Sequence, residues 1–214
     1  MVSVVARYDG ISKLSDNRWG FFPGISAGWN VHEEAFFKDS KFAEVVSLIK
    51  PRISYGLNGN VNGIGNFDVY GKYGSVGAYN GNLGYLNTGV VNSKLRWEKS
   101  HTFELGLDLG FFNNRVHMIM DYYNRTTSDL LTDVNLPEYT GFPSFKTNLG
   151  TISNRGFELE AKVNLLTKKD WSWDVTANTS FVKNMVKKLP FNGNANNRQG
   201  GSRYGIQNPT HWFG

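Results

Sequence analysis

The stretch Phe103–Leu131, FELGLDLGFFNNRVHMIMDYYNRTTSDLL, decides the fold class, because two runs of alternating residues flank the dipeptide Asn113-Asn114. Side chains alternate between the two faces of a β-strand, so each run gathers its apolar residues on one face. These apolar residues are Phe103, Leu105, Leu107 and Leu109, followed by Val116, Met118, Met120 and Tyr122. The other face carries Glu104, Asp108, His117 and Asp121. The stretch therefore predicts a β-hairpin with one apolar face and one polar face.

The same alternation recurs in a second hairpin toward the C-terminus. Gly156–Leu165 alternates without exception, Trp171–Phe181 follows a similar pattern, and the short turn Thr167–Asp170 joins them. Their apolar faces include Phe157, Leu159, Val163, Trp171, Trp173 and Val175, and their polar faces include Glu158, Glu160, Lys162 and Asp174. Ile25–Val31 and Ile53–Leu57 follow the same rule, so strands are expected along most of the chain.

The connections between these strands alternate between long and short. Long connections rich in Gly, Asn, Thr and Tyr cover residues 58–99, 124–154 and 184 onward, whereas 112–114 and 166–170 are tight. The order of the strands places the loop 9–18 at the same end as the long connections. The segment Glu33–Lys50 has apolar residues at roughly helical spacing, which predicts one short helical turn near 36–49 that Pro51 ends. If strands run up and down, the long connections share one end of the sheet and the helical turn joins the tight ones, as in transmembrane barrels.

Composition excludes several classes of protein and site. The chain has 214 residues, 40% of them apolar, and its net charge of +5 comes from singly scattered Lys and Arg, so we expect no nucleic-acid partner. It has no cysteine, which excludes disulfides and Cys-ligated metals. No apolar run reaches the roughly 18 residues of a spanning helix, and the first residues do not resemble a signal peptide. The chain is therefore either soluble or a piece of a membrane barrel.

Two antiparallel architectures compete for this pattern. A soluble carbohydrate-binding β-sandwich predicts strands of about five or six residues, whereas strands of about 9 to 11 residues cross a bilayer, and the strands here are long. Aromatic residues also sit toward strand ends, where interfacial girdles would place them: Trp97, Tyr122, Tyr123, Trp171 and Trp173. We therefore favour an all-β, antiparallel, up-and-down transmembrane β-barrel segment, with the apolar faces toward lipid and the polar faces toward the lumen.

Five linked segments resemble a known family. They are NRWGFFPGISAGWNVHEEAF (17–36), PRISYGLNGN (51–60), KLRWEKSHTFELGLDLGFFNNRV (94–116), DYYNRTTSDLL (121–131) and NLGTISNRGFELE (148–160). In this order they resemble the barrel of the SusC/RagA family, which are TonB-dependent transporters of the outer membrane of Gram-negative Bacteroidetes. Because the resemblance covers nearly the whole chain, it is far more specific than any short motif.

The resemblance implies a transporter that imports oligosaccharides or oligopeptides. Its barrel of about 22 strands would be closed by an N-terminal plug. The implied partners are a SusD-like surface lipoprotein, the TonB energy-transducing complex and membrane lipid, and no cofactor is implied. We expect residues 1–214 to be one internal barrel piece of about seven or eight strands, without the plug domain and the closing strands.

Other motifs favour simpler interpretations. The glycines at 59, 63 and 65 lack the spacing of a phosphate loop and predict a flexible extracellular loop. His32-Glu33-Glu34 lacks the second histidine of a zinc motif, so it predicts a solvated turn rather than a metal site. Glu158 and Glu160 could act as paired carboxylates of a hydrolase, but hydration of a pore wall explains them better, and we expect no catalytic residues. Extracellular-loop tyrosines could contact substrate or partner, or pack on one another: Tyr70, Tyr73, Tyr79 and Tyr85.

Overall fold

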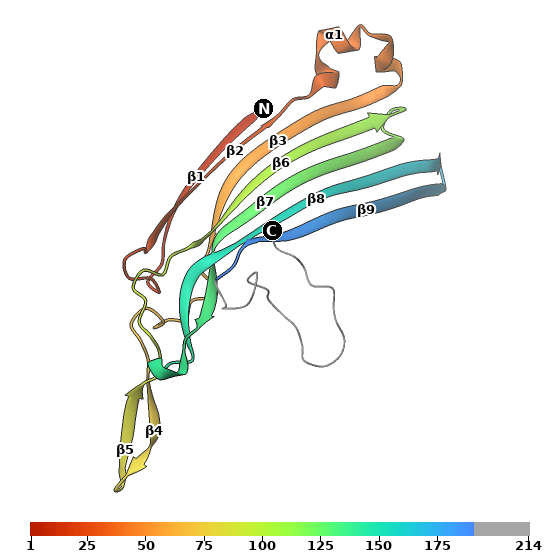
Figure 1. Cartoon of the computed structure of the whole chain (residues 1–214). Helices are drawn as coiled ribbons and strands as arrows, with labels where there is room; N and C mark the ends of the chain where they lie inside the picture. Colours follow the sequence, from red (N-terminus) through yellow and green to blue (C-terminus); the bar gives the residue numbers. More distant parts are fainter. Residues whose placement is uncertain (191–214) are drawn as a thin grey trace.

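A computed structural model describes residues 1–190, and they form one curved antiparallel sheet of seven strands (Figure 1). In spatial order the strands are β1 (Val2–Gly10), β2 (Trp19–Gly28), β3 (Val46–Asn60), β6 (Glu98–Phe111), β7 (Val116–Asn135), β8 (Ser144–Lys168) and β9 (Trp171–Lys188). A separate hairpin, β4 (Tyr73–Tyr79) and β5 (Asn82–Asn87), is inserted between β3 and β6. The predicted all-β, antiparallel, up-and-down arrangement is therefore confirmed, and β1 and β9 are the edges of the described sheet.

The register of β6 and β7 follows the predicted alternation. Leu107 is opposite Met120 and Leu109 is opposite Met118, so the apolar residues predicted for the two strands share one face, while Asp108 is opposite Ile119 on the other. The turn passes through Phe112, Asn113 and Asn114, all with positive φ (54°, 55° and 61°). Asn tolerates this left-handed conformation better than most residues, so the two asparagines explain how the hairpin closes.

The predicted helical turn is shorter than the sequence indicated. Only Val31–Glu33, α1 (Ala35–Lys38) and Lys41–Glu44 are helical, and residues 46–50 already belong to β3. Pro51 does not end a helix but lies inside β3, where its carbonyl accepts a hydrogen bond from Trp29 N–H (3.1 Å). The proline nitrogen faces the same side, beyond the end of β2, so its missing N–H leaves the β3–β6 ladder intact.

The long connection predicted at 124–154 is mostly strand. β7 continues to Asn135 and β8 begins at Ser144, which leaves only residues 136–143 between them. A β-bulge after Thr127 places Asp129 at φ 57° and lets the two strands pair again beyond it. The predicted tail from Asn184 is likewise strand as far as Lys188.

The two ends of the sheet differ as the connections predicted. Figure 1 shows the β1–β2, β3–β6 and β7–β8 connections at one end, and α1 with the tight β6–β7 and β8–β9 turns at the other. We call the first the loop end and the second the turn end. Among the described residues, no helix is long and apolar enough to span a bilayer.

A small hydrophobic core fixes the loop end. It consists of Leu14, Phe22, Ile64, Val69, Leu95 and Trp97, with the rings of Phe22 and Trp97 5.3 Å apart in an edge-on arrangement. Ile64 and Val69 are 2% and 1% exposed, so the glycine-rich segment around them is packed, and the prediction of a flexible loop is wrong there. The sheet has no comparable core, because no other layer of the described chain covers its apolar face.

Candidate functional site

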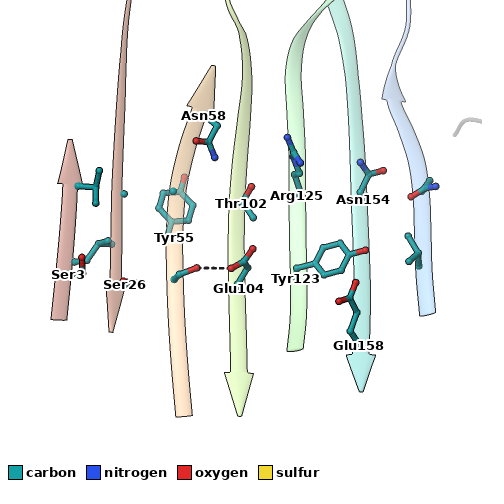
Figure 2. A pocket seen from close by; sticks show the side chains of 17 residues that line it. Ser3, Ser26, Tyr55, Asn58, Thr102, Glu104, Tyr123, Arg125, Asn154 and Glu158 are labelled. Carbon is teal, nitrogen blue, oxygen red and sulfur yellow. Dashed lines mark hydrogen bonds between the residues drawn. The ribbon is translucent and has the colours of Figure 1, made fainter. Parts of the chain in front are cut away.

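The polar face of the sheet forms a broad hollow toward the loop end (Figure 2). Its volume is about 900 Å³, and side chains from all seven strands line it. One row crosses the sheet through Ser3, Ser26, Ser54, Glu104 and Tyr123. By their register, the residues predicted to face a lumen all share this polar face: Glu104, Asp108, His117, Asp121, Glu158, Glu160, Lys162 and Asp174.

An arginine bridge crosses three strands of the polar face. Arg52 of β3 donates to Asp108 Oδ1 of β6 at 2.8 Å and to Asp121 Oδ1 of β7 at 3.0 Å. The bridge passes over Gly106, where a Cβ would lie 2.7 Å from Arg52 Cζ and 2.6 Å from Asp121 Oδ1. Sequence reasoning did not single out Arg52. The alternation of β3 does place Arg52 on the polar face. Only the register between the strands shows that Arg52 contacts both aspartates.

Polar contacts that join only two neighbouring strands continue toward the loop end. Ser54 Oγ donates to Glu104 (3.1 Å), as Figure 2 shows, and Asn60 Nδ2 donates to Glu98 (2.7 Å). The hydroxyls of Ser100 and Thr127 are 2.8 Å apart across β6 and β7. The polar face is therefore cross-linked between strands by side-chain hydrogen bonds.

The opposite face carries all the residues predicted to face lipid: Phe103, Leu105, Leu107, Leu109, Val116, Met118, Met120, Phe157, Leu159, Val163, Trp171, Trp173 and Val175. None of these side chains is buried: Trp171 and Leu105 are 74% and 44% exposed, and most of the others are partly exposed. Trp171 and Trp173 lie near the turn end of this apolar face. Near its loop end, Tyr55 Oη and His101 Nδ1 are 3.0 Å apart.

A buried carboxylate fixes the loop that follows β3. Asp68 accepts Gly65 N–H (2.8 Å) and pairs with Lys72 (2.6 Å) and with Lys146 of β8 (3.3 Å). Burial by itself would raise the pKa of Asp68, but hydrogen bonds from Lys72, Gly65 and Lys146 outweigh it and lower the pKa to about 2. The loop is thereby attached to a strand far along the chain.

A second network attaches the start of β6 to the bulge in β7. Arg96 pairs with Asp129 at 2.7 Å, and this hydrogen bond raises the pKa of the arginine. The amide of Asn148, 6% exposed, donates to the carbonyls of Arg96 (2.8 Å) and Asp129 (2.7 Å). These contacts explain why the β7–β8 segment is ordered strand instead of loop.

The predicted tyrosines lie on or beside the β4–β5 hairpin, which extends beyond the loop end (Figure 1). Tyr70, Tyr73 and Tyr85 are 57%, 76% and 63% exposed. Tyr79 belongs to β4, but its side chain lies outside the described part of the structure. Self-packing of these rings is not seen for the three that are described, and they remain accessible.

The candidate metal and hydrolase groups are placed differently. His32 Nδ1 is 3.5 Å from the Ile49 nitrogen, at the turn end, and no cluster of three or more metal-ligating side chains occurs within residues 1–190. Glu158 is opposite Asp121 and Ser180, while Glu160 is opposite Ile119 and Asn178. Both glutamates therefore stand on the open wall of the polar face rather than in a closed cleft.

Comparison with known proteins identifies the family to which this sheet belongs. Residues 2–211 match the family model "TonB dependent receptor-like, beta-barrel". The chain belongs to this family. The chain is 38% identical to the TonB-dependent receptor P3 of Formosa agariphila and 36% identical to the TonB-dependent receptor SusC of Bacteroides thetaiotaomicron, over 86% of its length in both cases. TonB-dependent receptors of this kind are outer-membrane proteins of Gram-negative bacteria, so the predicted localisation and the SusC/RagA resemblance are confirmed.

Solved structures agree with this family. The RagAB peptide transporter superposes with a TM-score of 0.80 at 31% identity over 89% of this chain, and its "open-open" state with a TM-score of 0.79. The chain spans 18% of receptor P3, 19% of SusC and 21% of the RagAB chain. The similarity therefore concerns one section of proteins about five times longer.

Proposed function

We propose that this chain forms one section of the barrel wall of a nutrient transporter in the outer membrane, with the polar face toward the lumen and the apolar face toward lipid. The observation that carries the proposal is that the apolar side chains of β6, β7, β8 and β9 gather on one face of a family-matched sheet, opposite most of the charged ones. Apolar side chains that no other described layer covers fit a lipid solvent, whereas a soluble sandwich needs a second sheet on that face.

The open edges support a section of a larger barrel. β1 and β9 each present an unpaired edge in the described sheet, and closure of a barrel requires strand number and shear that match its curvature. We infer that further strands pair with these edges and that a plug occupies the lumen beside the Arg52 bridge. The role is transport rather than catalysis, because the carboxylates of the polar face stand on an open wall.

The proposed substrate and partner are supported by the relatives and by the position of the loop end. SusC and the RagAB peptide transporter support import of an oligosaccharide or an oligopeptide, driven through TonB. The exposed Tyr73 and Tyr85 present flat rings that stack on sugar or peptide groups, or on a SusD-like lipoprotein at the mouth. Their position on a hairpin beyond the loop end suits capture at the cell surface.

Paired cysteines on one strand test the wall assignment. Ile53 and Ser54 are neighbours on β3 but lie on opposite faces. In the full-length protein in its own membrane, Ser54→Cys should react with a bulky water-soluble maleimide and then lose uptake, whereas Ile53→Cys should resist the same reagent. Uptake measured separately with oligosaccharides and with oligopeptides should show which of the two substrate classes the labelled protein no longer imports. Equal labelling of the two cysteines would contradict the proposed wall.

A further inference from the structure

The apolar face ends, toward the loop end, at a pair of cations. Arg155 of β8 and Lys183 of β9 are directly opposite each other, and both side chains are exposed. They lie two residues beyond Phe157 and Phe181, which are themselves opposite each other. At about 3.3 Å per residue the cations are about 6–7 Å past the apolar band along the strand, which is the depth of lipid headgroups.

Carboxylates are missing from this part of the apolar face. In the described strands, alternation puts the acidic residues of β6, β8 and β9, and Asp121 of β7, on the polar face. Within residues 1–190, neither Arg155 nor Lys183 belongs to an ion pair. Like charges directly opposite on neighbouring strands repel, so a bound anion between them would remove a destabilising contact.

Neutral polar groups surround the same position. Ser153, on the same face of β8 as Arg155, is 1% exposed, and its hydroxyl has no hydrogen-bond partner among the described residues. Asn124, directly opposite Arg155, has a buried Oδ1 that is also unpaired there. Ser153 and Asn124 therefore place neutral polar side chains beside the two cations, where the apolar face ends. Tyr55 shares the row of Arg155 on the same face, and tyrosines are enriched where such a face meets the membrane–water interface.

We propose that Arg155 and Lys183 bind the phosphate group of an outer-leaflet lipid headgroup on the outside of the barrel. The guanidinium matches phosphate oxygens with two parallel hydrogen bonds, and the ammonium adds a point charge. This site is separate from the transport path, because it faces away from the polar hollow. The proposal rests on the lipid-facing assignment of the apolar face made above.

The test compares two double variants of the full-length protein in detergent. Arg155→Gln with Lys183→Gln removes the two outward cations, while Lys50→Gln with Lys162→Gln removes two cations of the polar face. Diphosphorylated lipid A is the probe, and the same lipid without phosphates and inorganic phosphate are the two comparison ligands. We expect lipid A to bind the outward variant at least about ten-fold more weakly than wild type, and the polar-face variant to bind normally.

Each outcome bears on a different part of the proposal. Without lipid, the outward variant should unfold at the same temperature as wild type or higher, because repulsion is removed, so weak binding cannot be attributed to misfolding. Equal binding of wild type and the outward variant would overturn the site. Equal stabilisation by inorganic phosphate would overturn a lipid source. If the Ile53 and Ser54 labels support the wall assignment while lipid A binding is unchanged, only this site fails.

Discussion

Two adjacent apolar residues of β7 test the face assignment most sharply. Met118 lies on the apolar face opposite Leu109 and Ala161, and Ile119 lies on the polar face opposite Asp108 and Glu160. Both are partly buried and both are apolar, so hydrophobicity alone predicts that arginine is harmful at either position. The structure predicts opposite outcomes for Met118→Arg and Ile119→Arg.

The expected loss of unfolding free energy follows from the depth of each residue in the bilayer. The segment Trp171–Phe181 covers about 25 Å of bilayer thickness at about 3.3 Å per residue and a tilt of about 40°. Ala177 is near the middle of this segment and shares a row with Ala161 and Met118. At this tilt a row shifts by about 3 Å in depth per strand, so Met118 still lies well inside the hydrocarbon of the bilayer. Arginine there should cost about 2–4 kcal/mol of unfolding free energy. At Ile119 the new guanidinium meets two carboxylates in water, and the cost should stay within about 0.5 kcal/mol.

The measurement is denaturant unfolding of the full-length protein in lipid vesicles, together with its assembly in the outer membrane. The variant Met118→Trp tests whether Met118 contacts lipid or a protein core. Lipid has no fixed side chain to clash with a larger residue, whereas overpacking a core costs about 1–3 kcal/mol. Equal losses for Met118→Arg and Ile119→Arg, or a severe loss for Met118→Trp, would refute the transmembrane wall.

Three further predictions concern the bridge, the loop and the topology. Gly106→Val should displace Arg52 from Asp121 and cost about 0.5–1.5 kcal/mol of unfolding free energy, while the control Gly56→Ala, whose Cβ meets only a backbone atom at 3.9 Å, should cost less. Because the pKa of Asp68 is lowered in the folded protein, its ionised carboxylate stabilises the folded loop above about pH 4, and this contribution should disappear as the pH falls to about 2. The variant Asp68→Asn should remove the same contribution at about pH 7, which faster hydrogen exchange at residues 61–72 would show. An epitope inserted beside Lys168 should stay hidden on intact cells while one in the β4–β5 turn is labelled; surface labelling at Lys168 would reverse the assigned ends.

Alternation of side chains predicted the strands and their faces because it is a local property of the backbone. The turn at Asn113 and Asn114 was equally local, since asparagine itself supplies the unusual φ. The helical segment was overpredicted for a related reason: apolar residues near 36–49 satisfy helical spacing, but β6 offers a ladder to residues 46–50 that a helix could not use. The local sequence pattern therefore predicted which residues share a face of the sheet, but it predicted the boundaries of the elements less well.

Contacts between distant strands were not predictable from the sequence. Arg52 meets Asp121 only because β6 sets the register between β3 and β7, and Asp68 meets Lys146 only because the loop folds back over β8. The strands in 124–154 were missed because their Asn, Thr and Asp residues are typical of loops. There the bulge at Asp129 and the buried Asn148 stabilise pairing that composition does not indicate.

The cross-linked charges suit a wall along which a ligand must move. A solute passes a pore only if the surface attracts it enough for entry and too weakly to hold it. Arg52 satisfies both Asp108 and Asp121, and Ser54 and Asn60 donate to Glu104 and Glu98, so these carboxylates already have partners before any ligand arrives. Under the proposed function, a passing sugar or peptide would therefore exchange weak hydrogen bonds with the wall instead of forming new ion pairs. We propose that strong capture is the task of the accessible tyrosines of the loop end, where the packed core and the Asp68 network provide a fixed base.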